Sequence, residues 1–339
     1  MLVKFNVSKE SKAIGESRIV LAGDVGATKT NLALFKEEEG NVVSLHEAQY
    51  KSNDYKNIIE LTDAFIRDIP LPGSICFGVA GPVLNGHAKL SNINWEIDSA
   101  ELSNHFKVKN VYLINDLEAT AYGLAMLNEK DIAVIHNGNN AADGNIAVIA
   151  PGTGLGEAGL YWDGNYYYPF ATEGGHSDFA PRNEFDFELY TFLQKKFGHI
   201  SWERLICGPG IENIYDFLRD EKRREEPASL KEKFKNSDAA AVISEHVNQY
   251  DICKETMQLF IRYLAYESAN LVLKFKATGG LFIGGGIAPK IISLFENNEF
   301  FSSFCQSGRL NYLLEQVPVK IILNNKTALL GAAYYGTKK

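Results

Sequence analysis

Residues 19–35 read IVLAGDVGATKTNLALF, and this stretch decides the fold. The apolar run IVLA ends in the glycine-rich segment GDVGAT, and the apolar pattern resumes at residues 31–35. Apolar runs bounded by glycine-rich turns are typical of β-strands, so the stretch predicts two strands joined by a hairpin. A further strand is expected at residues 42–45, which makes the first part of the chain a three-strand meander.

Residues 145–162 read NIAVIAPGTGLGEAGLYW and repeat this architecture. An apolar run again leads into a glycine-rich segment, a second apolar run follows, and Asp163-Gly164-Asn165 supplies a turn before another strand pattern. The identity between the two copies is slight. The repeat is therefore one of architecture, and it predicts two lobes built on one plan.

After each meander the pattern changes to alternating helix and strand, which is the signature of parallel βαβ units. In the first half we expect helices at 55–69, 100–106 and 117–126, with strands at 74–79 and 110–114. In the second half we expect helices at 185–197, 210–219, 239–246, 252–275, 288–295 and 328–335, with strands at 280–283 and 319–323. The mixed-charge segment 219–235 is interpreted as a solvated face or an insertion.

Composition excludes several classes of protein. Thirty-four Lys and Arg against 42 Asp and Glu give a formal net charge of −8, so neither nucleic acid nor a membrane surface is expected as a partner. The polar N-terminal stretch lacks a signal peptide's apolar core, which predicts a cytoplasmic protein. The four cysteines have no metal-ligand spacing and resemble core residues of a reducing compartment; they are Cys76, Cys207, Cys253 and Cys305.

The two glycine-rich segments are the first candidates for a binding role. Backbone N–H groups without side chains approach phosphate oxygens closely, but each segment leads into a strand, so neither matches the P-loop or the dinucleotide fingerprint. A single such hairpin is more often a tight turn, whereas two equivalent copies favour phosphate sites. Asp24 adds a carboxylate for a hydrated Mg²⁺, or else an Asx-turn. Thr28 and Thr153 add hydroxyl donors, or are simply strand formers.

Asn115-Asp116 follows the buried strand pattern at 110–114 and precedes a helix. Ligands bind at the carboxyl ends of strands in open α/β sheets. Asp116 is therefore either a general base that takes a proton from a substrate hydroxyl or the N-cap of the helix.

Two further segments carry candidate residues. Glu173 and His176 lie in EGGHSDFAP, and Glu203 follows in SWER; together these groups suit hydrogen bonds to vicinal sugar hydroxyls, although each alone is more often structural. The segment GGGIAPK, at 284–290, lets a flat adenine or ribose lie against its backbone. Its alternative is a helix-start loop with proline in the first turn.

With these motifs in combination, residues 19–336 resemble bacterial-type glucokinases of the hexokinase/actin/heat-shock-protein ATPase superfamily. The resemblance implies an α/β, two-lobed actin-like ATPase (ribonuclease H-like) fold, in which each lobe is a mixed sheet and a cleft lies between the lobes. It implies a smaller lobe of residues 1–126 plus 325–339 and a larger one of residues 127–324. The quoted motifs are GDVGATKTNLAL, GVAGPV with LSNINW, LINDLEATAYG, PGTGLG, EGGHSDFAP and GGGIAPK.

Carried over by motif, the resemblance assigns roles to individual residues. It implies glucose contacts from Asn115, Asp116, Glu173, His176 and Glu203, with Asp116 as the catalytic base. It implies ATP contacts from Gly23, Asp24, Val25, Gly26, Ala27, Thr28, Gly152, Thr153, Gly284, Gly285 and Gly286. Mg-ATP is the expected cofactor, with Mg²⁺ held by Asp24 through water, and a homodimer is expected.

The sequence differs from the patterns of related sugar kinases in three respects. The cysteine-rich zinc signature of the repressor-like sugar kinases is missing, so no zinc is expected, and no helix-turn-helix pattern precedes the first glycine-rich segment. Glu157 stands where the family usually has a small or apolar residue, and its side chain is expected to point either to solvent or toward a metal.

The expected activity is transfer of the γ-phosphoryl group of ATP to the 6-hydroxyl of D-glucose. Two alternatives stay open. One is a kinase for fructose, mannose or an N-acetylated hexosamine, because discrimination among hexoses rests on a few hydrogen bonds. The other is a non-catalytic, nucleotide-dependent actin-like protein, which leaves the sugar-type residues unexplained.

Overall fold

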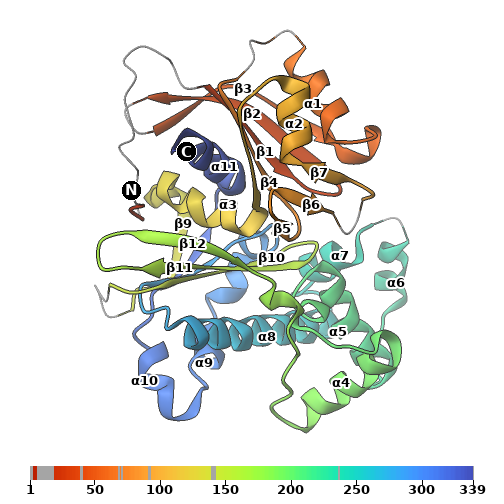
Figure 1. Ribbon diagram of the computed structural model, residues 1–339. Coiled ribbons are helices and arrows are strands. Elements are labelled where there is room, and N and C mark those ends of the chain that lie inside the picture. The colour runs from red at the N-terminus through yellow and green to blue at the C-terminus, as the bar shows by residue number, and fades with distance from the viewer. Residues whose placement is uncertain are drawn as a thin grey trace. The chain divides into compact units, whose positions relative to one another are not determined.

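The computed structural model describes residues 3–5, 19–38, 41–67, 69, 72–90, 93–138, 143–235 and 237–338. The chain divides into two compact units (Figure 1). The first unit comprises Met1–Ile132, Ala158–Ala171 and Asn324–Lys339, and the second comprises Ala133–Glu157 and Thr172–Leu323. The predicted lobe limits stay a prediction, because compactness alone does not show which residues move together as one lobe.

The sheet of the first unit has the strand order β3-β2-β1-β4-β8. Strands β1 and β2 pair antiparallel, as do β2 and β3, whereas β1, β4 and β8 run parallel. The meander followed by parallel crossovers is the predicted arrangement. The strands are β1 (Ile19–Val25), β2 (Lys29–Glu38), β3 (Asn41–Lys51), β4 (Ser74–Val79) and β8 (Asn110–Asn115).

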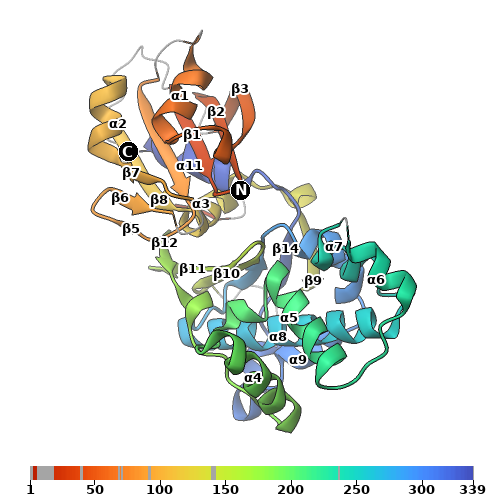
Figure 2. The ribbon, with the colours of Figure 1, turned by 90° about the vertical axis from the view of Figure 1, so that its right-hand side faces the viewer.

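Helices cover both faces of this sheet, as Figures 1 and 2 show. Successive side chains of a strand point to opposite faces. Leu21 and Val25 of β1 therefore join the core under α1 (Ile58–Ile66) and α2 (Ser99–Phe106). Val20 and Ala22 join the core under α3 (Asp116–Gly123) and α11 (Thr327–Lys338). Asp24 continues this second series, so it belongs to the face that α3 covers.

The second sheet has the order β12-β11-β10-β13-β14-β9, with β10, β13 and β14 parallel. Its first five strands follow the plan of the first sheet, which confirms the predicted repeat of architecture. The strands are β9 (Ile132–His136), β10 (Ile146–Pro151), β11 (Leu155–Trp162), β12 (Tyr167–Thr172), β13 (Gly280–Ile283) and β14 (Val319–Ile322).

The core of the second unit is organised by α8 (Asp251–Phe275), which buries residues along most of its length. The other α-helices of this unit are α4 (Glu184–Phe197), α5 (Gly208–Asp220), α6 (Ala228–Phe234), α7 (Ala239–Glu245), α9 (Glu299–Phe304) and α10 (Asn311–Leu314). The 3₁₀ helices of the described residues are Ser52–Asp54, Leu124–Met126, Glu129–Asp131, Gly174–His176, Trp202–Arg204, Ala288–Phe295 and Gly308–Leu310.

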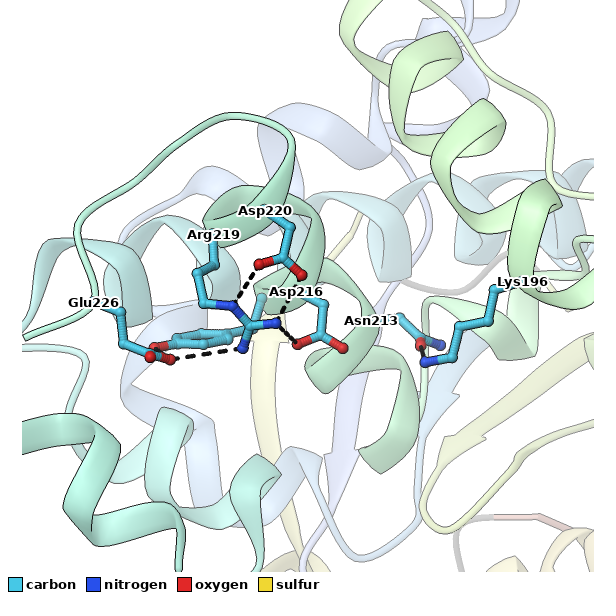
Figure 3. Close-up of polar contacts among 7 residues, drawn as sticks. Lys196, Asn213, Asp216, Arg219, Asp220 and Glu226 are labelled. Carbon is cyan, nitrogen blue, oxygen red and sulfur yellow. Dashed lines mark hydrogen bonds and ion pairs between the residues drawn. The ribbon is translucent and has the colours of Figure 1, made fainter.

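Ion pairs at the end of α5 reach into the mixed-charge segment that follows. Figure 3 shows the Arg219 guanidinium among three carboxylates, with N–O distances of 2.9 Å to Asp216, 2.7 Å to Asp220 and 3.6 Å to Glu226. The side chain of Arg219 is 34% exposed, which agrees with a solvated face. The sequence pattern missed helix α6 in this segment, because its short apolar pattern is diluted by charge.

Several other elements differ from their predictions. The helix predicted at 55–69 begins at Ile58, because the Asn57 side chain accepts a hydrogen bond from the N–H of Glu60 and caps it there. The helix predicted at 288–295 is 3₁₀ and is interrupted at Ile291. A small sheet of β5 (Val83–Leu84), β6 (His87–Lys89) and β7 (Glu96–Asp98) was not predicted, since its strands are too short for a periodic signal.

Three of the four cysteines are buried, and none forms a disulfide, as predicted for core residues. Burial raises the pKa of the Cys207 thiol to about 12 and that of the Cys253 thiol to about 11, which suppresses the thiolate. No helix within the described residues is long and apolar enough to cross a bilayer. Ser91 and Asn92 of the LSNINW motif lie outside the described residues.

Candidate active site

In the first unit, the carboxyl ends of three parallel strands form one edge of the sheet. The register aligns Val25 of β1 with Val79 of β4, and Val79 with Asn115 of β8. Asp24 and Asp116 therefore lie at the same edge, two strands apart, and a strand spacing of 4.7–4.9 Å separates the backbones of β1 and β8 by about 10 Å. Asp24 belongs to the face covered by α3, and Asp116 is the first residue of that helix. The edge thus carries two carboxylates at the place where α/β sheets bind ligands.

Asn115 caps α3. Its Oδ1 accepts hydrogen bonds from the N–H groups of Leu117 at 2.9 Å and Glu118 at 3.3 Å. Its Nδ2 donates to the carbonyl of Gly81 at 3.1 Å, which attaches the GVAGPV loop to the start of the helix. The interpretation of Asp116 as the N-cap is wrong, because Asn115 caps the helix. Asn115 is itself buried.

Asp116 is half-buried at the N-terminus of α3. Its Oδ1 accepts a hydrogen bond from the N–H of Leu117 at 2.9 Å. The positive end of the helix dipole favours a carboxylate at this position. The side chain is thereby held as an oriented hydrogen-bond acceptor at the sheet edge.

The first glycine-rich segment, residues 23–28, is a tight turn. The N–H of Gly26 donates to the carbonyl of Lys29 at 3.0 Å, and the Ser52 hydroxyl donates to the carbonyl of Gly26 at 2.6 Å. Gly23 and Val25 are buried strand residues, whereas Ala27 is half-buried and Thr28 is exposed. The turn therefore offers backbone groups, and the Thr28 hydroxyl, to a ligand.

Asp24 is oriented by a chain of side-chain amides. Asn31 Nδ2 donates to Asp24 Oδ2 at 3.2 Å, and Gln49 Nε2 donates to Asn31 Oδ1 at 2.8 Å. Burial raises the pKa of the Asp24 carboxyl, and the hydrogen bond from Asn31 opposes that rise. No group of three or more His, Cys, Asp or Glu side chains suited to a metal ion occurs in the described residues. A single carboxylate nevertheless fits Mg²⁺, which keeps several waters and takes its other ligands from phosphates.

In the second unit, the second glycine-rich segment meets the GGG segment. The N–H of Gly152 donates to the carbonyl of Gly154 at 2.8 Å and closes the turn. The N–H of Gly284 donates to the carbonyl of Ile149 at 2.8 Å. Gly285 has a φ of 76°, and a Cβ there would lie 2.2 Å from the carbonyl oxygen of Pro151. Only glycine fits this approach, so the predicted phosphate and adenosine segments form one backbone surface.

The N-terminus of α5 joins the same surface. The sequence pattern predicted a helix at 210–219 but did not assign its start to this surface. The N–H of Gly208 donates to the carbonyl of Gly152 at 2.9 Å, and Cys207 caps the helix with its Sγ. The Gly208-Pro209-Gly210 sequence was the available signal, because proline in the first turn marks a helix start.

The sugar-type residues of the second unit lie on two turns that are joined to each other. In the 173–177 turn, the N–H of His176 donates to the carbonyl of Glu173 at 3.0 Å, and both side chains are exposed. The N–H of Trp202 donates to the carbonyl of Ser177 at 3.0 Å, which brings Glu203 alongside. His176 Nδ1 then lies 4.0 Å from Glu203 Oε1. The structure thus brings Glu173, His176 and Glu203 together.

Glu203 also reaches the second glycine-rich segment, since its Oε2 accepts a hydrogen bond from the N–H of Leu155 at 2.9 Å. Glu157 does not point to solvent as one of its two interpretations held; it is 1% exposed. The reason is packing, because its carboxyl lies against Gly174.

Comparisons with known proteins agree with one another. A family model described as Glucokinase matches residues 21–339. The chain is 39% identical over 334 residues to a glucokinase from Nostoc sp. (strain PCC 7120), an alignment that covers 93% of this chain and 98% of the relative.

Solved structures show the same likeness. A glucokinase from an Antarctic psychrotroph has a TM-score of 0.81 at 30% identity, over 96% of this chain and 100% of that chain. A glucokinase from Balamuthia mandrillaris in complex with glucose has a TM-score of 0.81 at 20% identity, over 97% of this chain and 96% of that chain, which bears on the fold alone. The predicted α/β fold of the actin-like ATPase type is confirmed.

Proposed function

The chain belongs to the glucokinase family, and from this premise we propose that it transfers the γ-phosphoryl group of ATP to the 6-hydroxyl of D-glucose, giving glucose 6-phosphate and ADP. The observation that supports this most directly is the pair of carboxylates, Asp24 and Asp116, at one sheet edge in the first unit. Asp24 suits a phosphate-bound cation, and Asp116 suits a reacting hydroxyl.

Asp116 is proposed as the general base. It takes the proton of the 6-hydroxyl as that oxygen attacks the γ-phosphorus, and the helix dipole of α3 together with the N–H of Leu117 holds its carboxylate in place. Asn115 fixes the position of Asp116 by capping the helix. Phosphoryl transfer needs little else beyond positioning and charge stabilisation.

ATP is proposed to lie on backbone surfaces. Residues 23–28, Gly152 with Thr153, and residues 284–286 supply N–H and hydroxyl donors for its phosphates and a flat backbone for its adenosine. Asp24 would hold Mg²⁺ through water, with Asn31 orienting its carboxylate. When bound, Mg²⁺ neutralises charge on the phosphate oxygens.

Glucose is proposed to be bound by residues from both units. Asn115 and Asp116 come from the first unit, and Glu173, His176 and Glu203 from the second. Because both units supply ligands, glucose binding is expected to draw them onto one molecule and to exclude water that would otherwise accept the phosphoryl group. We further propose, as the family resemblance implies, a cytoplasmic homodimer, which light scattering after size-exclusion chromatography tests.

The test of the proposed activity is ADP formation from Mg-ATP with a panel of hexoses: glucose, fructose, mannose and N-acetylglucosamine. We expect the highest kcat/KM for glucose and no ADP formation above background without sugar. A higher kcat/KM for another hexose would identify that hexose as the preferred substrate. ADP release that does not depend on sugar would contradict the kinase assignment.

A further inference from the structure

Glu157 is a buried carboxyl that the proposed reaction does not use. It is the third residue of β11 and is 1% exposed. Its Oε1 is buried and has no hydrogen-bond partner among the described residues. A buried acidic group in this state is costly unless it serves a purpose or loses its charge.

The carboxyl of Glu157 lies directly against the backbone of the 173–177 turn. A Cβ added at Gly174 would lie 1.9 Å from Oε2 and 2.9 Å from Cδ of Glu157, so the side chain occupies the space that a residue other than glycine would need. The backbone is tied to the same turn, because the Thr172 hydroxyl donates to the carbonyl of Glu157 at 3.1 Å and accepts from the N–H of Gly174 at 3.2 Å.

Burial, and then repulsion from a neighbouring carboxylate, favour the uncharged form of Glu157. From α8 it faces Glu267 and Lys274, and the turn packed against it carries Glu173 and His176. Burial raises the pKa of Glu157 to about 8, repulsion from Glu267 adds to the rise, and Lys274 opposes it. The side chain of Glu267 is fully buried, with Oε1 3.3 Å from Lys274 Nζ.

We propose that Glu157 is a positioning residue for the glucose site: its carboxyl, packed under Gly174, holds the turn that presents Glu173 and His176 to the sugar. The inference rests on the proposed glucose site. A charge on this carboxyl would be repelled by Glu267, with Lys274 as the opposing cation, and its Oε1 would lack a hydrogen-bond donor among the described residues. Displacement of the turn would relieve this burial. Ionisation therefore weakens glucose binding while Asp116 and the ATP surfaces are untouched.

The experiment measures KM for glucose and KM for ATP, with kcat, from about pH 7 to about pH 9.5 in the natural protein and in E157Q, whose amide has the same shape and stays uncharged. If only the uncharged form binds, KM for glucose rises about tenfold by one pH unit above the midpoint. In E157Q this rise is absent, and in E157A KM for glucose is raised at every pH. KM for ATP stays within about twofold throughout.

Two further variants and one control test whether the pH dependence belongs to Glu157. E267Q removes the repulsion and moves the midpoint of the KM rise to lower pH, whereas K274M removes the opposing cation and moves it to higher pH. E245Q makes the same chemical change at the exposed end of α7 and leaves the profile as it was. Circular dichroism confirms that each variant is folded.

The outcomes separate this inference from the proposed function. If the natural protein does not phosphorylate glucose at pH 7, the proposed function fails. If it does, but E157Q keeps the same rise of KM with pH, or E157A has the natural KM, the role of Glu157 is refuted and the kinase assignment stands. A folded E157Q with a raised KM at every pH also refutes it.

Discussion

Glu203 accepts a hydrogen bond from the backbone N–H of Leu155 at 2.9 Å, and this contact attaches a proposed glucose ligand to the glycine-rich segment proposed to hold phosphate. The other oxygen of the same carboxylate lies 4.0 Å from His176. One side chain therefore joins the proposed glucose surface to the proposed phosphate surface within the second unit.

We expect Glu203→Ala to raise KM for both glucose and ATP by about tenfold each, because the loss of one net hydrogen bond corresponds to about 1.4 kcal/mol. Glu203→Gln keeps an acceptor for Leu155 and should restore KM for ATP but not KM for glucose. Glu173→Ala should affect glucose alone, because the Glu173 side chain has no hydrogen bond to that segment among the described residues. Steady-state kinetics with each substrate varied measures this, and an unchanged KM for ATP in Glu203→Ala would contradict the shared role.

Asp116→Asn should lower kcat by about 10²–10⁴-fold, because the amide accepts the Leu117 hydrogen bond but cannot take a proton. The fold should be retained, since Asn115 still caps α3. Coupled measurement of ADP formation at saturating glucose provides kcat, and thermal unfolding provides the control. Near-normal turnover would remove Asp116 from the role of base.

Asn115→Ala should destabilise the first unit by about 1–2 kcal/mol, because the helix loses its N-cap. Asn115→Asp is the matched control: it keeps the cap oxygen but loses the donor to Gly81, so its loss of stability should be smaller. Denaturant unfolding with the two variants side by side measures the difference. Equal stability of all three proteins would show that water replaces the cap.

Asn31→Ala should raise the Mg²⁺ concentration for half-maximal activity by about tenfold, because ligand carboxylates depend on the groups that orient them. The loss of this hydrogen bond also removes the contact that lowers the pKa of Asp24, so the defect should grow as pH falls. Gln49→Ala acts one step further out and should have a smaller effect. A Mg²⁺ titration at fixed ATP decides, and identical curves for Asn31→Ala and the natural protein would oppose a metal role for Asp24.

Glu157→Gln should stabilise the protein at neutral and alkaline pH. The pKa of Glu157 is raised from 4.5 to about 8, so between these values the folded chain keeps a proton that the unfolded chain releases. The free energy of unfolding therefore falls as pH rises through this window, by about 1.4 kcal/mol per pH unit and by several kcal/mol in total to order of magnitude. Glutamine lacks this penalty. The difference in Tm between the two proteins should widen from pH 5 to pH 8, and a constant difference would mean that Glu157 is ionised when folded.

Much of the fold follows from local pattern. The strands at 74–79 and 280–283 match β4 and β13, since an apolar run bounded by turn residues carries enough information within itself. The helix at 252–275 differs from α8 by one residue at its start. The short strands β5 to β7 and helix α6 were missed because so few residues carry no measurable period.

The candidate site divides in the same way. That Asp24, Asn115 and Asp116 lie at the carboxyl ends of parallel strands is a matter of order along the chain, and spacing predicts it. Spacing does not predict which of the two adjacent residues caps α3. Asn115 and Asp116 are both good caps, and only the path of the backbone selects one.

Amino-acid order alone established the repeated meanders, the glycine turns and the residue types needed for phosphate and sugar, because apolar periodicity and turn chemistry act over a few residues. The folded chain alone settled that Glu203 holds Leu155, that Gly285 lies on Pro151, and that Glu157 is buried under Gly174 beside Glu267. Each of these contacts joins segments distant in the sequence. Their existence depends on strand register and on how closely backbones approach, and neither quantity is written in a local pattern.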